Sequence, residues 1–421
     1  MKNVLVIVYY FPPMGGSGVQ RPLKFVKYLR KFGWNPIVLC PEPGAYNVFD
    51  ASLQKELNEM EIEVHRVRGN TPLHAAGERK VVLPEWLENL LRKISTVFWL
   101  PDNKKGWIKQ GLTKAEELIK NKKIDIIFAS APPYSNLILA KEIKKKFNIP
   151  VVMDLRDDWL ESHLIKYPSA WHYSKMKAIE KETLSLADQL VTINSYISGS
   201  IDKRNVNSNK TIVITQGFDP ADFDSEKEKN LQSGKLSFLY SGTFYPESGP
   251  NIFLKAMASF LEENPKYKDV IELQFQGVLS EKDRSFFNKH KLERNVKDFG
   301  FLPHSEAVQN LKNTDILWLN NTHTKNSAML SLGKTYEYMA SGKPILAMIP
   351  DGDIKNTLTH YKAAFISNPE DIEALVDNIS KIVSLWEEQK LPKPDKEFIS
   401  KFDRKTLTQE LASIFNVISN E

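Results

Sequence analysis

Residues 4–32, VLVIVYYFPPMGGSGVQRPLKFVKYLRKF, contain the signals of a strand, a turn and a helix. The run 4–8 is apolar and mostly β-branched, which is typical of a strand buried on both faces of a parallel sheet. Two prolines and three glycines interrupt it between residues 12 and 18. Over residues 19–32 apolar side chains recur at helical spacing, with Lys and Arg on the other face. A second apolar run at 35–40 completes a strand–helix–strand unit, the seed of a doubly wound sheet.

The same alternation continues along the chain, and 421 residues exceed what one hydrophobic core usually supports. A charged, weakly apolar stretch at 222–233 divides two series of elements. We therefore expect α/β domains at 1–220 and 235–395, and a C-terminal helix within 396–421 that is able to return to the first domain. The further strands that we expect are 62–67, 124–129, 151–154, 190–193 and 211–215 in the first series, and 236–240, 271–276, 296–299, 315–319 and 344–348 in the second.

The composition excludes several classes of protein. There is a single cysteine, Cys40, so the chain cannot form an intrachain disulfide, which fits a reducing compartment. Because Cys40 lies in an apolar run, we expect it in the core. There is no run of about 18 apolar residues and no signal peptide pattern, so we expect a cytoplasmic protein. The net charge of +5 does not require nucleic acid as a partner, but it suits phosphate-bearing substrates or an anionic membrane surface.

The first motif is the loop Gly15-Gly16-Ser17-Gly18, between the first strand and the first helix. Glycines let backbone N–H groups approach an anion closely, and the helix N-terminus adds a partial positive charge. The spacing matches neither the dinucleotide fingerprint nor a P-loop. A tight turn explains the loop equally well.

The second motif is GKTYEYMASGKPILA at residues 333–347, which predicts a helix from Gly333 to Gly342 and then a strand. Glu337 lies in the first turns of this helix, where a carboxylate can accept hydrogen bonds from both hydroxyls of a ribose. The free N–H groups at the helix start then face phosphates. A glutamate that complements the helix dipole is the alternative interpretation.

Together these motifs resemble glycosyltransferase family 4, whose members are retaining enzymes of the GT-B fold. The resemblance covers nearly the whole chain and implies an α/β fold of two Rossmann-like domains that face a central cleft. It also implies a UDP- or GDP-linked sugar as donor, and neither a metal nor another cofactor. The segments that carry it, in order, are 10–18, 214–219, 240–243, 299–304 and 333–342.

The resemblance implies roles for individual residues. Glu337 would hold the ribose, the amides of Leu332 and Gly333 would face the diphosphate, and the backbone around Phe301 would meet the base. The glycine loop would approach the diphosphate and the sugar from the first domain. The implied donor-binding residues are Gly15, Gly16, Ser17, Gly18, Gly242, Thr243, Phe301, Leu332, Gly333, Lys334 and Glu337.

The chain departs from the family pattern at three positions. Met329 stands where the family has a second glutamate, and Thr243 and Ser248 stand where it usually has an Arg and a Lys. Because a diphosphate leaving group needs charge stabilisation in the transition state, we expect Lys334 to act as the substitute. An ordinary solvated lysine is the alternative.

The third motif, MDLRDDW at residues 153–159, follows the fifth strand, and strand ends in such sheets face the ligand crevice. We expect Arg156 to bind an acceptor phosphate or to stabilise the sugar, and Asp157 to orient the acceptor; an Arg–Asp ion pair that stiffens the loop is the alternative. The catalytic candidates are thus Arg156, Asp157 and Lys334, and the acceptor-binding candidates are Ser130, Tyr134, Ser135 and Asp154.

Residues 83–110 interleave large apolar side chains with lysines and an arginine. They predict either an amphipathic helix packed on its own domain or a face that lies on an anionic membrane.

The predicted function is that of a retaining, hexosyltransferase-type glycosyltransferase, cytoplasmic or peripheral at the inner face of the membrane. Its expected acceptor is a glycan or a lipid-linked sugar of surface polysaccharide biosynthesis, such as lipopolysaccharide or capsule. A GT-B epimerase or hydrolase and a non-catalytic scaffold remain open. A Rossmann oxidoreductase is disfavoured, because the glycine spacing is wrong and Cys40-Pro41-Glu42 is a poor match to an acidic strand end.

Overall fold

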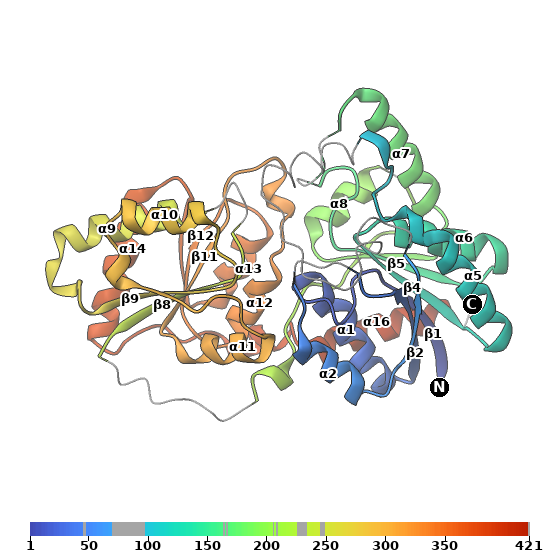
Figure 1. The fold of residues 1–421 in the computed structure, drawn as a ribbon, viewed down its shortest axis with the longest axis horizontal. Coiled ribbons are helices and arrows are strands. Elements are labelled where there is room, and N and C mark those ends of the chain that lie inside the picture. The colour runs from blue at the N-terminus through green and yellow to red at the C-terminus, as the bar shows by residue number, and fades with distance from the viewer. Residues whose placement is uncertain are drawn as a thin grey trace. The chain divides into compact units, whose positions relative to one another are not determined.

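The structure, a computed structural model, describes residues 1–44, 48–69, 97–162, 165, 167–204, 206–207, 209–224, 234–244 and 249–419. The chain divides into two compact units. The first, here called the N-unit, comprises Met1–Gln216 and Arg404–Glu421, and the second, the C-unit, comprises Gly217–Asp403. Each unit has a parallel sheet with helices on both faces (Figure 1). Most of the predicted linker, residues 225–233, lies outside the described residues.

The N-unit sheet has the strand order β3-β2-β1-β4-β5-β6-β7, and every pairing in it is parallel. The strand order therefore reverses between β1 and β4, which makes this the switch point where such sheets bind ligands. The strands are β1 (Lys2–Ile7), β2 (Trp34–Pro41), β3 (Glu63–Val67), β4 (Ile126–Ala131), β5 (Val151–Leu155), β6 (Gln189–Thr192) and β7 (Ile212–Val213). The helices are α1 (Ser17–Leu29), α2 (Ala51–Glu59), α5 (Ile108–Asn121), α6 (Ser135–Phe147), α7 (Ala170–Leu184), α8 (Ser195–Lys203) and α16 (Arg404–Ile418).

The C-unit sheet has the order β10-β9-β8-β11-β12-β13, again parallel, with its switch point between β8 and β11. The predicted doubly wound α/β fold class is confirmed. The strands are β8 (Leu236–Ser241), β9 (Ile271–Gln276), β10 (Val296–Asp298), β11 (Ile316–Asn320), β12 (Ile345–Met348) and β13 (Ala364–Ser367). The helices are α9 (Asn251–Glu263), α10 (Glu281–Lys289), α11 (His304–Asn313), α12 (Gly333–Ala340), α13 (Asp353–Tyr361), α14 (Ile372–Glu387) and α15 (Lys396–Ser400).

Some elements differ from the sequence predictions, among them helix α8, which was not predicted. The strand expected at 211–215 is only two residues long, because the Arg21 guanidinium binds the next carbonyls, those of Ile214 and Thr215. Strand β13 and helix α2 were not predicted. Strand β13 is four residues long, too short for a clear periodicity, whereas α2 has a recognisable start at Asp50, whose carboxylate accepts hydrogen bonds from two N–H groups of its first turn.

The last helix, α16, completes the core of the N-unit. It lies against α1, and the Phe415 ring lies 5.3 Å from the Trp34 ring and 5.8 Å from that of Phe128, between centroids. All three side chains are at most 1% exposed. Among the described residues, no helix is long and apolar enough to span a membrane.

We predict that Phe415→Ala lowers the free energy of unfolding by about 3–5 kcal/mol, because the N-unit loses a buried ring and retains part of the cavity. Urea unfolding followed by circular dichroism measures the change. Val417→Ala, on the same helix at a side chain that is 63% exposed, is the control and is expected to change stability by at most about 0.5 kcal/mol. Equal losses in the two variants would show that α16 adds no core contacts.

Candidate functional site

In the C-unit, three glycines form a row at the carboxyl ends of neighbouring strands. Gly242 follows β8, Gly277 follows β9 and Gly300 lies just after β10, all with positive φ angles. The Gly242 N–H donates to the Gln276 carbonyl at 2.7 Å, and the Gly277 N–H donates to the Gly300 carbonyl at 2.8 Å. A Cβ atom at Gly277 would lie 2.5 Å from the Gly242 carbonyl oxygen. The row therefore requires glycine and keeps side chains away from the strand ends.

The amino group of Lys334 lies at the Gly242 end of this row. Its Nζ donates to the Tyr240 hydroxyl at 2.9 Å and lies 4.1 Å from the centroid of the Tyr240 ring. A Cβ atom at Gly242 would be 3.0 Å from this Nζ. Burial lowers the pKa of Lys334 to about 7, against the opposing charge of Glu337. Lys334 is thus held over β8, and it is not an ordinary solvated lysine.

Helix α12 brings Lys334 and Glu337 to the same place. It starts at Gly333, and its N-cap residue, Leu332, forms no side-chain capping bond. Glu337 is partly exposed and lies one turn beyond Lys334. An N-terminus that no side chain caps, with an ammonium group beside it, suits a phosphate group.

Some residues that shape this site were missed in the sequence. The Tyr338 hydroxyl accepts a hydrogen bond from the Ser241 N–H at 2.8 Å and so ties α12 to the end of β8. Tyr240 and Gly277 also form part of the site. Gly277 follows a predicted strand directly, a signal that could have revealed it. Of the other candidates, Thr243 is exposed, the Phe301 side chain is 41% exposed, and Ser248 lies outside the described residues.

In the N-unit, the glycine loop forms a tight turn after β1. Gly16 has a φ of +96°, and a Cβ atom at Gly15 would lie 2.8 Å from the Val48 side chain. A Cβ atom at Gly18 would make only ordinary contacts. Backbone geometry therefore requires the first two glycines whether or not an anion binds. No side chain caps the start of α1, and no acidic residue lies in its first turn.

Two predicted acceptor residues lie inside the N-unit. Asp154 is 0% exposed and pairs with Arg21 at 2.8 Å, while the Ser130 hydroxyl donates to the same carboxylate at 2.7 Å. Arg21 also binds the carbonyls after β7. The polar atoms of Asp154 and Ser130 thus face inward and join α1, β4, β5 and the end of β7. Contact between these residues and an acceptor stays a prediction.

The Arg156 guanidinium holds neighbouring loops together. Its nitrogens donate to the carbonyls of Gly18 at 2.6 Å, Ala131 at 3.1 Å and Pro132 at 2.8 Å. The residue is 8% exposed, and burial lowers the pKa of its guanidinium. In this arrangement Arg156 positions the glycine loop and the loop after β4 relative to each other. Asp157, the next residue, is half-buried, and its charge faces Arg156.

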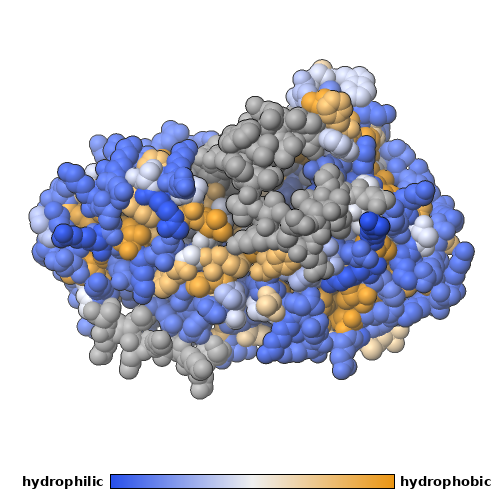
Figure 2. All heavy atoms as spheres, in the orientation of Figure 1, coloured by the Kyte–Doolittle hydropathy of each residue, from blue (hydrophilic) through white to orange (hydrophobic). Residues whose placement is uncertain are grey.

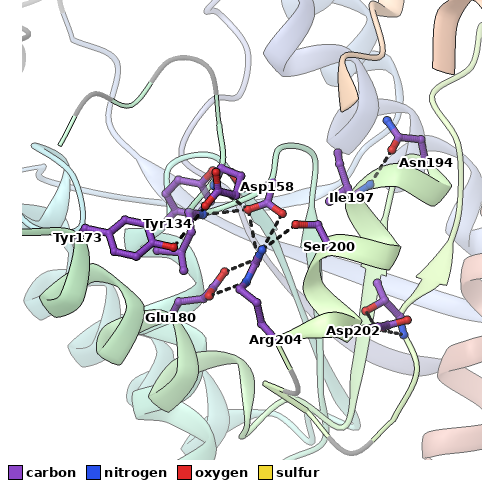
Figure 3. Close-up of polar contacts among 12 residues, drawn as sticks. Tyr134, Asp158, Tyr173, Glu180, Asn194, Ile197, Ser200, Asp202 and Arg204 are labelled. Carbon is purple, nitrogen blue, oxygen red and sulfur yellow. Dashed lines mark hydrogen bonds and ion pairs between the residues drawn. The ribbon is translucent and has the colours of Figure 1, made fainter. Parts of the chain in front are cut away.

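A buried ion-pair triad fixes the loop that carries Asp157. Figure 3 shows Arg204, just after α8, pointing between two carboxylates, Asp158 on the loop and Glu180 on α7. The closest contacts are 3.0 Å to Asp158 and 2.7 Å to Glu180, and the two carboxylate side chains are 1% and 0% exposed. Burial raises the pKa of Glu180 to about 7, although Arg204 opposes the change.

The remaining predicted acceptor residues are also buried. The Tyr134 ring stacks on Trp159 with 4.5 Å between centroids, and its hydroxyl donates to the Asp158 carbonyl at 3.1 Å. The Ser135 N–H donates to the Asp102 carboxylate at 2.9 Å. We expected residues 130–135 to form a loop, but Ser130 belongs to β4 and Ser135 begins α6, so the connection is only residues 132–134.

Two family descriptions match the chain. Residues 19–222 match Glycosyltransferase Family 4, and residues 222–395 match Glycosyl transferases group 1. No curated protein matches the sequence.

Solved structures share the fold over nearly the whole chain. A glycosyltransferase from Rickettsia africae ESF-5 has a TM-score of 0.67 and 16% identity, covering 99% of this chain and 98% of its own. Sucrose-phosphate synthase from Thermosynechococcus elongatus has a TM-score of 0.66 and 14% identity, covering 99% of both chains. HepE from Anabaena, solved in complex with UDP, has a TM-score of 0.62 and 15% identity, covering 99% and 100%.

Two doubly wound units, with glycines between β1 and α1 in the first and Gly242 after β8 in the second, next to each switch point, define a two-domain protein of the GT-B fold. The family matches together span residues 19–395, and the chain belongs to the family 4-type glycosyltransferases. The resemblance seen in the sequence is confirmed.

We predict that Arg204→Met lowers the free energy of unfolding by about 3–5 kcal/mol near neutral pH, because it leaves two buried carboxylates without their cation. Without the opposing charge of Arg204, the pKa of Glu180, which burial raises to about 7, rises further. The deficit is therefore smallest at low pH, where this carboxyl group is protonated in the folded and unfolded states, and grows as the pH rises through the folded pKa of Glu180. Thermal unfolding across pH measures it.

Lys203→Met is the matched control for this test, because Lys203 is the neighbouring exposed residue. It is expected to unfold like the parent protein at every pH. A pH-independent deficit in the Arg204 variant would contradict the assigned triad.

Proposed function

We propose that the chain is a retaining, hexosyltransferase-type glycosyltransferase that uses a nucleotide diphosphate sugar as its donor. The observation that carries the proposal is the position of the Lys334 amino group, beside Gly242 and one helical turn from Glu337. The family pattern puts an Arg next to this glycine, and here Thr243 stands at that place. Lys334 brings a cation to the same strand end from α12.

The reaction breaks the bond between the anomeric carbon and the diphosphate oxygen and forms a bond to an acceptor oxygen. Negative charge develops on the diphosphate, and the acceptor hydroxyl loses its proton. Lys334 and the N–H groups at the start of α12 are positioned to stabilise the diphosphate, while Glu337 accepts hydrogen bonds from the ribose. We include retention of configuration and independence from metals, because the family resemblance implies both. HepE, a structural neighbour, was solved with UDP-glucose, which favours a UDP-linked donor over a GDP-linked one.

For the acceptor, we propose a glycan or a lipid-linked sugar of surface polysaccharide biosynthesis, such as lipopolysaccharide or capsule. The protein would act in the cytoplasm, at the inner face of the membrane. The family resemblance implies this class of acceptor. In the N-unit, Arg156 and the Asp158–Arg204–Glu180 triad hold the loop of Asp157 in one position. Asp157 is the half-buried carboxylate in this group and is our candidate for orienting the acceptor hydroxyl.

A non-catalytic scaffold is the second candidate, and Met329 and Thr243 are the observations that favour it. Both stand where the family has charged residues. A scaffold would bind the nucleotide without turnover, so product analysis with labelled donor separates the two functions.

We predict that UDP raises the melting temperature of the protein and that Glu337→Ala abolishes most of this shift, because the ribose loses its acceptor. A ligand at about 100 times its Kd stabilises a protein by about 2.7 kcal/mol, which a thermal shift assay resolves. Glu306→Ala removes an exposed glutamate from α11 and serves as the control with an unchanged shift. A full shift in the Glu337 variant would refute the ribose assignment.

We also predict that UDP binding at about pH 8 takes up a proton, because Lys334 is largely neutral above its pKa of about 7 and the diphosphate favours the ammonium form. Below that pKa the uptake disappears, since the free protein is already protonated, and affinity falls as the pH rises. Calorimetry in buffers of different ionisation enthalpy measures the uptake. Lys334→Met should abolish it, and uptake that persists in this variant would assign the proton to another group.

A further inference from the structure

Large exposed apolar side chains gather at one place on the N-unit. Residues 97–99 lie beside the start of α7, where the Val97 carbonyl is 3.3 Å from Nε2 of His172. Four side chains at this place are 40–69% exposed, and we call them the aromatic patch: Val97, Phe98, Trp99 and Trp171. Elsewhere among the described residues, large exposed apolar side chains are scattered along the chain, as is normal for protein surfaces.

The patch lies at an outer end of the N-unit. In Figure 1, α7 extends away from the sheet with the short turn of residues 97–98 beside it. Figure 2 shows orange and pale atoms at the same end, above the region drawn in grey. Internal packing accounts for other aromatic residues of the segment, since Trp107, only a few residues later, is 0% exposed. Of the segment predicted at 83–110, residues 83–96 lie outside the described residues. Its described part therefore contains both buried and exposed large apolar side chains.

The exposed surface of α7 carries lysines. Lys175 lies about one turn from Trp171, Lys177 and Lys181 are exposed on the other flank of the helix, and Lys105 is exposed after residues 97–99. The exposed acid on this helix, Glu182, pairs with lysines of α6 instead. Tryptophan and phenylalanine next to ammonium groups suit the boundary between lipid headgroups and acyl chains, where the rings insert and the lysines meet anionic phosphates.

We propose that the aromatic patch and the lysines of α7 dock the N-unit on an anionic lipid bilayer. The positive charge beside the rings favours an anionic bilayer over a neutral or purely apolar partner, which would not need the lysines. Docking would bring the enzyme to a lipid-linked acceptor, and in this purpose alone the proposal rests on the proposed function. Binding to the bilayer itself requires no donor.

The test uses the full chain and vesicles of phosphatidylcholine, with or without phosphatidylglycerol. We expect co-sedimentation with the anionic vesicles that weakens as salt is added, and quenching of tryptophan fluorescence by brominated lipids. The variant Phe98→Ala/Trp99→Ala/Trp171→Ala should lose at least about tenfold in partitioning. Lys175→Glu/Lys177→Glu should lose at least about 25-fold on anionic vesicles and little on neutral ones, because each lysine contributes about fivefold at such a surface.

The control is Val417→Ala on α16, where the side chain is 63% exposed, and it should bind vesicles like the parent protein. UDP-induced stabilisation should be unchanged in all these variants, so failure of the patch and failure of the donor site give different results. Absence of binding to anionic vesicles, or equal binding by the aromatic variant, would overturn the proposal. So would a dimer in solution that the aromatic variant converts to monomer, because the patch would then be a protein interface.

Discussion

The amino group of Lys334 lies at the end of β8, where a Cβ atom at residue 242 would crowd it at 3.0 Å. The same crowding extends along the strand ends, where Gly277 approaches the Gly242 carbonyl so closely that a Cβ atom would clash. Because glycine stands at three adjacent strand ends, backbone groups and the amino group of Lys334 lie there in place of other side chains. At these strand ends glycine leaves room for α12, which brings the amino group of Lys334 there, and burial lowers the pKa of this group.

The N-unit uses its charges differently. Arg21, Arg156 and Arg204 all donate to groups inside the unit, and each connects loops or helices that are distant in the sequence. Buried ion pairs of this kind add little net stability, but the loss of one partner is strongly destabilising. Their effect here is to give the strand-end loops one fixed arrangement.

The sequence predicted the fold well because long apolar runs alternate with amphipathic segments, and strands such as β1 and β9 lie close to where they were expected. It predicted α12 because Gly333 and Gly342 flank its glutamate. It could not reveal that Lys334 lies on Tyr240, since 94 positions separate the two and only the sheet brings them together. Arg21 was read as part of a solvated helix face, yet it is 1% exposed. A helical pattern shows which face is polar, but not which polar residue finds a buried partner.

The return of α16 to the N-unit has a consequence for synthesis on the ribosome. Domains usually fold as the chain emerges, beginning from the N-terminus. Here the first unit is discontinuous, and Phe415 enters its core only after the whole C-unit has been translated. The C-unit, which is one continuous segment, is complete first. Until then, the buried apolar side chains that α16 covers in the finished protein, Trp34 among them, lack this partner.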